Sequence, residues 1–236
     1  RSYPVDPTHA IVSINVKESH PTTHRRDFQL TPAMEILGYI RDSRGKIVEG
    51  AKILGLTKHG GPKVVPKGVF AVQGVSKENA HLILIYHEQK KLAVALEVRA
   101  NKKRRLEARL QSMGGIEGKL VDKAGKPIVG HDVIATISVP RDRFVNIPLE
   151  FVNNMGFYGL FPSAWKATTA RKTTTDAQGR FRVEGMIPDL KYTLAVGKNW
   201  KSERDPIQPL AKTEFKILSG KVVNLGTKTF VKRPLR

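Results

Sequence analysis

Hydrophobic and polar residues alternate along much of this chain, and segment 173–196 shows the pattern most clearly. Phe181 and Val183 alternate with charged neighbours, which is the period of a half-buried β-strand. The tetrapeptide 176–179, Asp-Ala-Gln-Gly, precedes this strand, and its aspartate and glycine favour a tight turn. We therefore predict a β-hairpin around this turn, and a further strand at residues 192–196, where the alternation resumes.

An internal repeat organises much of the remaining sequence. Eight residues between positions 25 and 50 recur 80 positions later, between 105 and 130, without a gap. Segment 68–75 matches segment 179–186 in the pattern Gly-x-Phe-x-Val-x-Gly. Each copy of the first segment holds a strand, an Asp-x-x-Gly-Lys turn and a returning strand. These four strands are predicted at residues 36–41, 51–56, 116–121 and 132–138. The repeat indicates two duplicated structural units.

The same Asp-to-Gly spacing occurs in three predicted turns. Their residues are Asp42, Gly45, Asp122, Gly125, Asp176 and Gly179. Because each aspartate precedes a glycine by three positions, a turn-forming role explains it without catalysis or calcium binding.

The second copy contains an insertion near residues 140–172. It holds aromatic side chains in a glycine- and proline-broken setting, and the candidate binding residues among them are Phe157, Tyr158, Phe161 and Trp165. Two interpretations stay open. These aromatics cap the open end of the second unit, or they form an exposed anchor for a partner protein or glycan.

Further strands are predicted outside the repeat. One is isolated at residues 11–16, two lie at 81–86 and 92–98, and two final strands flank the pair Ser219-Gly220. Residues 104–113 also show helical spacing of apolar side chains. We nevertheless predict a strand there, because the equivalent segment of the first copy contains a proline and no helical stripe.

The turn and strand residues of the second copy carry a family resemblance. The motif Gly-x-x-x-Asp-x-x-Gly-x-x-x-x-Gly at 118–130, followed by Thr-Asp-x-x-Gly-x-Phe-x-x-x-Gly-x-x-Pro at 175–188 and Tyr-x-Leu-x-Val, resembles the carboxypeptidase regulatory-like domain. That family is a seven- or eight-stranded sandwich, similar to transthyretin and to the B-repeats of bacterial surface adhesins. In the first copy, Val65-Pro66-Lys67-Gly68 replaces the Thr-Asp-x-x-Gly turn.

These patterns predict an all-β protein with two tandem antiparallel β-sandwiches, the second enlarged by the insertion. The expected divisions are an N-terminal strand region at 1–24, a first sandwich at 25–104 and a second at 105–236. The resemblance implies a carbohydrate-binding-like fold and a non-catalytic appendage of a larger protein. Fold analogy alone does not establish a function.

Charge is the main compositional feature. The 236 residues include 41 Lys and Arg against 21 Asp and Glu, which gives a net charge of +20 and a surface that attracts polyanions. The polyanion candidates are the cluster Lys102, Lys103, Arg104 and Arg105 and the tail Lys232, Arg233 and Arg236. The alternative for both is a solvated loop, because no aromatic residues are interleaved with the cations.

Candidate chemistry is sparse. The absence of cysteine excludes disulfides and thiolate chemistry, and no phosphate loop or serine elbow is present. Neither His20 and His24 nor His87-Glu88 completes a zinc motif, so we expect no metal and no cofactor. An internal isopeptide bond between Lys119 and Asn224, with Glu184 as catalyst, would require an apolar pocket around these three residues.

We therefore expect a non-enzymatic spacer or docking module of a larger, exported polypeptide, located outside the cytoplasm. The chain begins with arginine, which indicates a processed product or a piece of a longer protein, and no apolar run approaches the ~20 residues needed to span a bilayer. Expected partners are neighbouring domains and a protein or anionic glycan, with nucleic acid ranked below them. The competing hypothesis is a polyanion-binding protein, and a peptidase ranks last.

Overall fold

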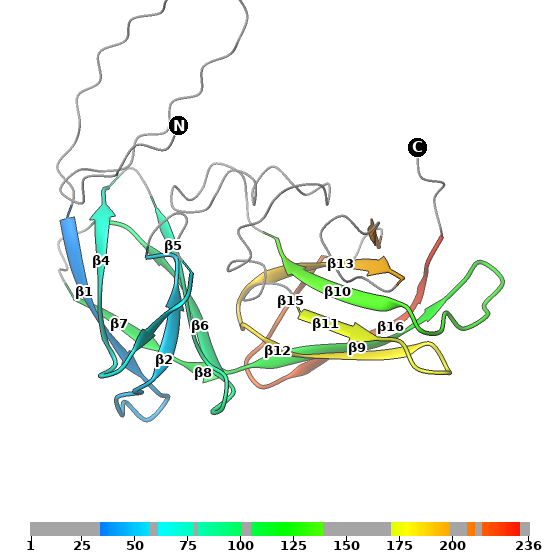
Figure 1. Ribbon diagram of the computed structural model, residues 1–236, viewed down its shortest axis with the longest axis horizontal. Helices are drawn as coiled ribbons and strands as arrows, with labels where there is room; N and C mark the ends of the chain where they lie inside the picture. Colours follow the sequence, from blue (N-terminus) through cyan, green and yellow to red (C-terminus); the bar gives the residue numbers. More distant parts are fainter. Residues whose placement is uncertain are drawn as a thin grey trace, which may run out of the picture.

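The structure, a computed structural model, describes residues 34–56, 61–77, 80–100, 105–138, 171–198, 207–210 and 214–231. Every helix or strand in these ranges is a β-strand, which confirms the predicted all-β class. The strands form two three-stranded and two five-stranded sheets (Figure 1). Within the described ranges, no helix has the length and apolarity to span a bilayer.

The first sandwich pairs a three-stranded with a five-stranded sheet. Its three-stranded sheet has the order β4 (Val69–Val75), β1 (Met34–Arg41) and β7 (Arg105–Arg109). Its five-stranded sheet has the order β3 (Lys63–Val65), β2 (Ala51–Leu54), β5 (His81–His87), β6 (Leu92–Val98) and β8 (Gln111–Ser112). Apolar side chains from both sheets form one buried cluster between them.

The other two sheets lie around a second buried cluster, and we name them the second sandwich. Its three-stranded sheet has the order β12 (Arg180–Met186), β9 (Gly114–Val121) and β16 (Val222–Thr229). Its five-stranded sheet consists of β11 (Arg171–Thr174), β10 (Asp132–Ile137), β13 (Lys191–Gly197) and β14 (Ile207–Pro209), with β15 (Phe215–Lys216) also pairing with β13. The alternating residues Phe181 and Val183 point into this core as predicted.

Among the described strands, β1 with β7 and β9 with β16 form parallel pairs, and the other pairs are antiparallel. β7 joins the three-stranded sheet of the first sandwich after the chain has passed through β5 and β6, and β16 joins that of the second after β13, β14 and β15. Such a long crossover allows parallel pairing, whereas a tight turn permits only antiparallel pairing.

The predicted hairpin around 176–179 is wrong. β11 pairs with β10 and β12 pairs with β9, so the turn carries the chain from one sheet of the sandwich to the other. The Asp176 carboxylate accepts hydrogen bonds from the backbone N–H groups of Gln178 (2.9 Å) and Arg180 (2.8 Å), which shapes the reversal. A local turn motif specifies this reversal but not the strand with which each arm pairs.

Residues 105–109 form a strand, as predicted, but pair with β1 of the first sandwich. The domain boundary predicted between residues 104 and 105 would separate β7 from the sheet that it forms with β1. The backbone next forms β8 against β6, and β9 of the second sandwich begins at Gly114. We therefore place the proposed boundary at Met113. The predicted strand at 11–16 lies outside the described residues.

A glycine and a phenylalanine meet across neighbouring strands at equivalent places in both sandwiches. The Phe70 ring lies against Gly38, and the Phe181 ring lies against Gly118. A Cβ atom on Gly118 would be 2.8 Å from Cζ of Phe181 and 3.0 Å from the carbonyl oxygen of Gly226. These glycines therefore make room for the aromatic side chains of the core.

We expect Gly118→Ala to lower the free energy of unfolding by about 1–3 kcal/mol, the usual cost of overpacking a core. Chemical denaturation monitored by circular dichroism measures this change. Gly118→Ala combined with Phe181→Leu should lose less than the sum of the two single variants. Additive losses would contradict a steric contact between the two side chains.

Candidate functional site

Several predicted site residues lie outside the described part of the chain. These are Phe157, Tyr158, Phe161, Trp165, Lys102, Lys103, Arg104, Lys232, Arg233, Arg236, His20 and His24. The binding and polyanion hypotheses built on them stay predictions. Arg105 is described, and its side chain is exposed on β7.

The described histidine and carboxylate residues form no cluster of three or more that is able to hold a metal ion. Nδ1 of His87 accepts a hydrogen bond from the backbone N–H of Lys90 (3.3 Å), within the turn between β5 and β6. Glu88 instead pairs with Lys52, with 3.2 Å between Oε2 and Nζ. The pair His87-Glu88 therefore takes part in turn and strand contacts.

The three aspartates at the predicted turns share one geometry. In each turn the aspartate Oδ1 accepts hydrogen bonds from the backbone N–H groups two and four residues later, at 2.8–2.9 Å. The hydrogen bond from the backbone N–H of Arg180 lowers the pKa of the Asp176 carboxyl, and the hydrogen bond from the Arg180 side chain lowers it further. These carboxylates therefore accept hydrogen bonds within their own turns.

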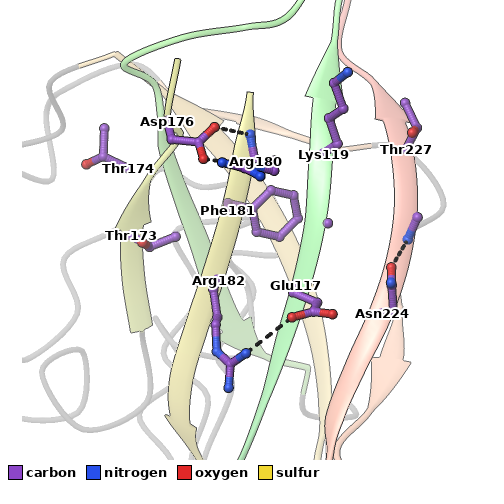
Figure 2. A pocket seen from close by; sticks show the side chains of 12 residues that line it. Glu117, Lys119, Thr173, Thr174, Asp176, Arg180, Phe181, Arg182, Asn224 and Thr227 are labelled. Atoms are coloured by element: carbon purple, nitrogen blue, oxygen red, sulfur yellow. Dashed lines mark hydrogen bonds and ion pairs between the residues drawn. The ribbon is translucent and has the colours of Figure 1, made fainter. Parts of the chain in front are cut away.

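The polar groove of the second sandwich lies on the outer side of β12, β9 and β16 and extends to β11 (Figure 2). Its volume is about 580 Å³. The ion pairs there join Arg180 Nε to Asp176 Oδ2 at 2.8 Å, and Arg182 Nη1 to Glu117 Oε2 at 3.3 Å. Both carboxylates of the groove thus face a guanidinium, so neither is arranged as a general base beside a nucleophile.

Of the hypothesised isopeptide residues, Glu184 and Asn224 are exposed and Lys119 is partly exposed. The Asn224 side-chain oxygen accepts a hydrogen bond from the N–H of Gly226 (2.8 Å), and Lys119 points away from it (Figure 2). Glu184 pairs with Arg182 at 2.8 Å and is 57% exposed. The structure therefore does not place these three residues in the apolar pocket that the reaction requires.

Tyr192, the first residue of the Tyr-x-Leu-x-Val motif, has a structural role. Its side chain is buried, and its hydroxyl accepts a hydrogen bond from the N–H of Ile187 (2.9 Å) and donates one to the carbonyl oxygen of the same residue (3.2 Å). Burial strongly raises the pKa of Tyr192. The hydroxyl thus fastens the β12–β13 connection to the core.

His81 is a buried titratable residue that the sequence analysis did not single out. It is 1% exposed, and neither ring nitrogen has a hydrogen-bond partner among the described residues. Burial lowers the pKa of His81, and the nearby backbone of Gly74 opposes only part of this effect. The folded protein therefore favours the neutral imidazole.

The two sandwiches are joined by packing as well as by the chain. Five residues on β2, β5 and β6 belong to the same hydrophobic cluster as the second core: Leu54, Leu82, Leu84, Tyr86 and Ala93. The backbone continues this contact, because the N–H of Met113 donates to the carbonyl of Lys91 (2.8 Å) and that of Gly220 donates to the carbonyl of Ser112 (3.0 Å). The sequence indicates this contact through the unbroken apolar run of β5, because a strand that is apolar on both faces is typically buried on both faces.

No family model and no curated protein matches this sequence. Among solved structures, a streptococcal ancillary pilin is 12% identical, with a TM-score of 0.33 over 86% of this chain and 63% of that one. The TIE protein of Bacillus anthracis is 13% identical, with a TM-score of 0.27 over 83% of this chain and 34% of that one. A 9R-lipoxygenase from Cyanothece is 15% identical, with a TM-score of 0.28 over 63% of this chain and 20% of that one.

The chain spans about a third of the Bacillus protein and less than two thirds of the streptococcal pilin. At these identities and TM-scores the matches carry no argument about function. The resemblance to the carboxypeptidase regulatory-like domain stays a prediction, and the proposals below rest on the contacts in the structure.

Proposed function

We propose that this chain is a non-enzymatic spacer and docking module, built from two copies of one sandwich, within a larger exported polypeptide. Its two sandwiches act as one stiff unit that holds neighbouring domains at a set separation. The supporting observation is the hydrophobic cluster that runs from β5 into the core of the second sandwich. Flexibly linked domains lack such a shared apolar contact.

The connection between the sandwiches supports the same role. β8 ends at Ser112 and β9 begins at Gly114, so Met113 alone separates a strand of one sandwich from a strand of the other. Its backbone N–H is bonded to Lys91 of the first sandwich. A linker of this length, held by a hydrogen bond, leaves little freedom for independent motion.

Inserting a short Gly-Ser linker between Ser112 and Met113 tests the proposal. We expect the unaltered protein to tumble as one body and the insertion variant to show two faster, separate rotational correlation times. Backbone ¹⁵N relaxation measures both.

The matched control carries the same linker in the exposed turn between Lys123 and Ala124. This control should tumble like the unaltered protein. Separate tumbling of the two sandwiches before any insertion would refute a stiff spacer. Zinc-dependent peptide hydrolysis by the intact chain would instead favour the enzyme hypothesis.

A further inference from the structure

The outer faces of the two three-stranded sheets occupy equivalent positions but differ in chemistry. β1 lies between β4 and β7 as β9 lies between β12 and β16. The register is also equivalent. Tyr39 pairs with Val69 where Lys119 pairs with Arg180, and Leu37 pairs with Ala71 where Glu117 pairs with Arg182. Four apolar positions of the first sandwich thus correspond to four charged positions of the second.

The fold does not require this face to be apolar, because the second sandwich forms the same sheet with charged side chains there. Leu37 is 42% exposed and Val69 is 46% exposed. Apolar side chains that gather on an exposed face, next to polar residues, are typical of interaction sites. We name Leu37, Tyr39, Val69 and Ala71 the apolar face.

A basic edge borders the apolar face along β7. Glu107 Oε1 is shared by two guanidinium groups, at 3.0 Å from Arg109 Nε and 3.8 Å from Arg41 Nε. The Arg105 guanidinium makes no ion pair with the described residues. It borders a depression of about 440 Å³ together with Tyr39 and Glu107. The edge therefore has three cations and one carboxylate, and a ligand carboxylate would improve its charge balance.

We propose that the apolar face and its basic edge bind an acidic polypeptide segment. Aliphatic side chains of the segment cover Leu37, Tyr39 and Val69, and its carboxylates pair with Arg105 and Arg109. The proposal deepens the docking role stated above. Figure 1 shows β1 and β4 on the side of the first sandwich that faces away from the second.

A second copy of the chain fits this face less well. Each copy carries a net charge of +20, and the basic edge would bring like charges together. Four residues on two strands also provide much less than the ~800 Å² per partner of a stable protein interface. A glycan fits less well too, because the face has a single aromatic ring and its aliphatic side chains offer no hydrogen bonds to hydroxyl groups.

The test uses the full chain and two synthetic peptides. One peptide alternates leucine with glutamate, and the other alternates leucine with lysine. In an NMR titration we expect the glutamate peptide to shift the signals of Leu37, Tyr39, Ala71 and Arg105 first. The lysine peptide should bind at least tenfold more weakly.

Two variants locate the binding. Leu37→Ser, Tyr39→Gln, Val69→Thr and Ala71→Ser together make the apolar face polar without changing its charge, and affinity should fall at least tenfold. Arg105→Gln keeps the apolar face and should weaken binding about two- to fivefold, as expected for an exposed charge pair. This second variant keeps the test decisive if the fourfold variant fails to fold.

Several results would overturn the proposal. These are absence of binding, shifts spread over the basic surface, equal binding of the lysine peptide, and unchanged affinity in the variants. Tighter binding of a heparin fragment to the same residues would identify a glycan site. Concentration-dependent dimerisation that the fourfold variant abolishes would identify a self-association surface. The tumbling experiment reports on the stiff spacer independently of all these outcomes.

Discussion

Replacing Leu84 with alanine is expected to lower the free energy of unfolding by about 2–5 kcal/mol and to weaken both sandwiches together. Leu84 is 0% exposed and belongs to the hydrophobic cluster that includes the second core. Its truncation leaves a cavity where β5 contributes to that shared cluster. Native-state hydrogen exchange should then show faster opening of amides in β9 and β13 as well as in β5.

Ile85→Ala is the matched control for this experiment. Ile85 is the next residue on β5, is also 0% exposed, and belongs to the core of the first sandwich. We expect a similar loss of stability, with the faster exchange confined to the first sandwich. If Leu84→Ala also leaves the exchange of β9 and β13 unchanged, the two sandwiches are not coupled through this cluster.

The second large effect concerns pH. The pKa of His81 is lowered in the folded protein, so below about pH 6.5 the unfolded chain binds a proton that the folded protein does not. The stability contributed by neutral His81 is therefore present above the unfolded pKa. It is lost as the pH falls from that value towards the lower folded pKa. The slope for one such group has an upper limit of about 1.4 kcal/mol per pH unit.

Urea denaturation at a series of pH values between about 7.5 and 5 measures this loss. His81→Leu removes the titrating group from its buried position, so the difference between the two profiles isolates its contribution. His87→Leu serves as the control, because His87 lies partly exposed at the other end of β5. Parallel profiles for the unaltered protein and His81→Leu would show that His81 is protonated equally in the folded and unfolded states.

Strand positions followed from the sequence because they depend on short-range alternation. Tyr192 and Leu194 are buried as the pattern predicts, and the predicted strands at 81–86 and 92–98 are present as β5 and β6. The strand at 105–109 was recoverable from the internal repeat even though its own spacing resembled a helix. Most predictions of site residues stay untested, because several of these residues fall outside the described ranges.

The residues that distinguish the apolar face from the polar groove are present in the sequence, but the sequence does not show that they lie on exposed surface. Leu37 and Glu117 are equivalent positions of the repeat, yet alternation alone does not show which side of a strand faces solvent. The exposed fraction of Leu37 depends on β4 and β7, which lie beside β1 in the sheet but far from it in the sequence. Likewise, the sequence shows His81 as a polar residue at the start of an apolar run but does not show that its side chain is buried.

The sequence by itself determined the all-β class, most strands of the described ranges and the Asp-Gly turns, because each depends on residues close together in the chain. Only the tertiary structure decided that the turn at 176–179 joins two sheets, that β7 belongs with β1, and that β5 is shared between two cores. The physical reason is that every strand offers the same backbone hydrogen-bonding groups to any partner. Pairing is therefore decided by packing between residues distant in the sequence.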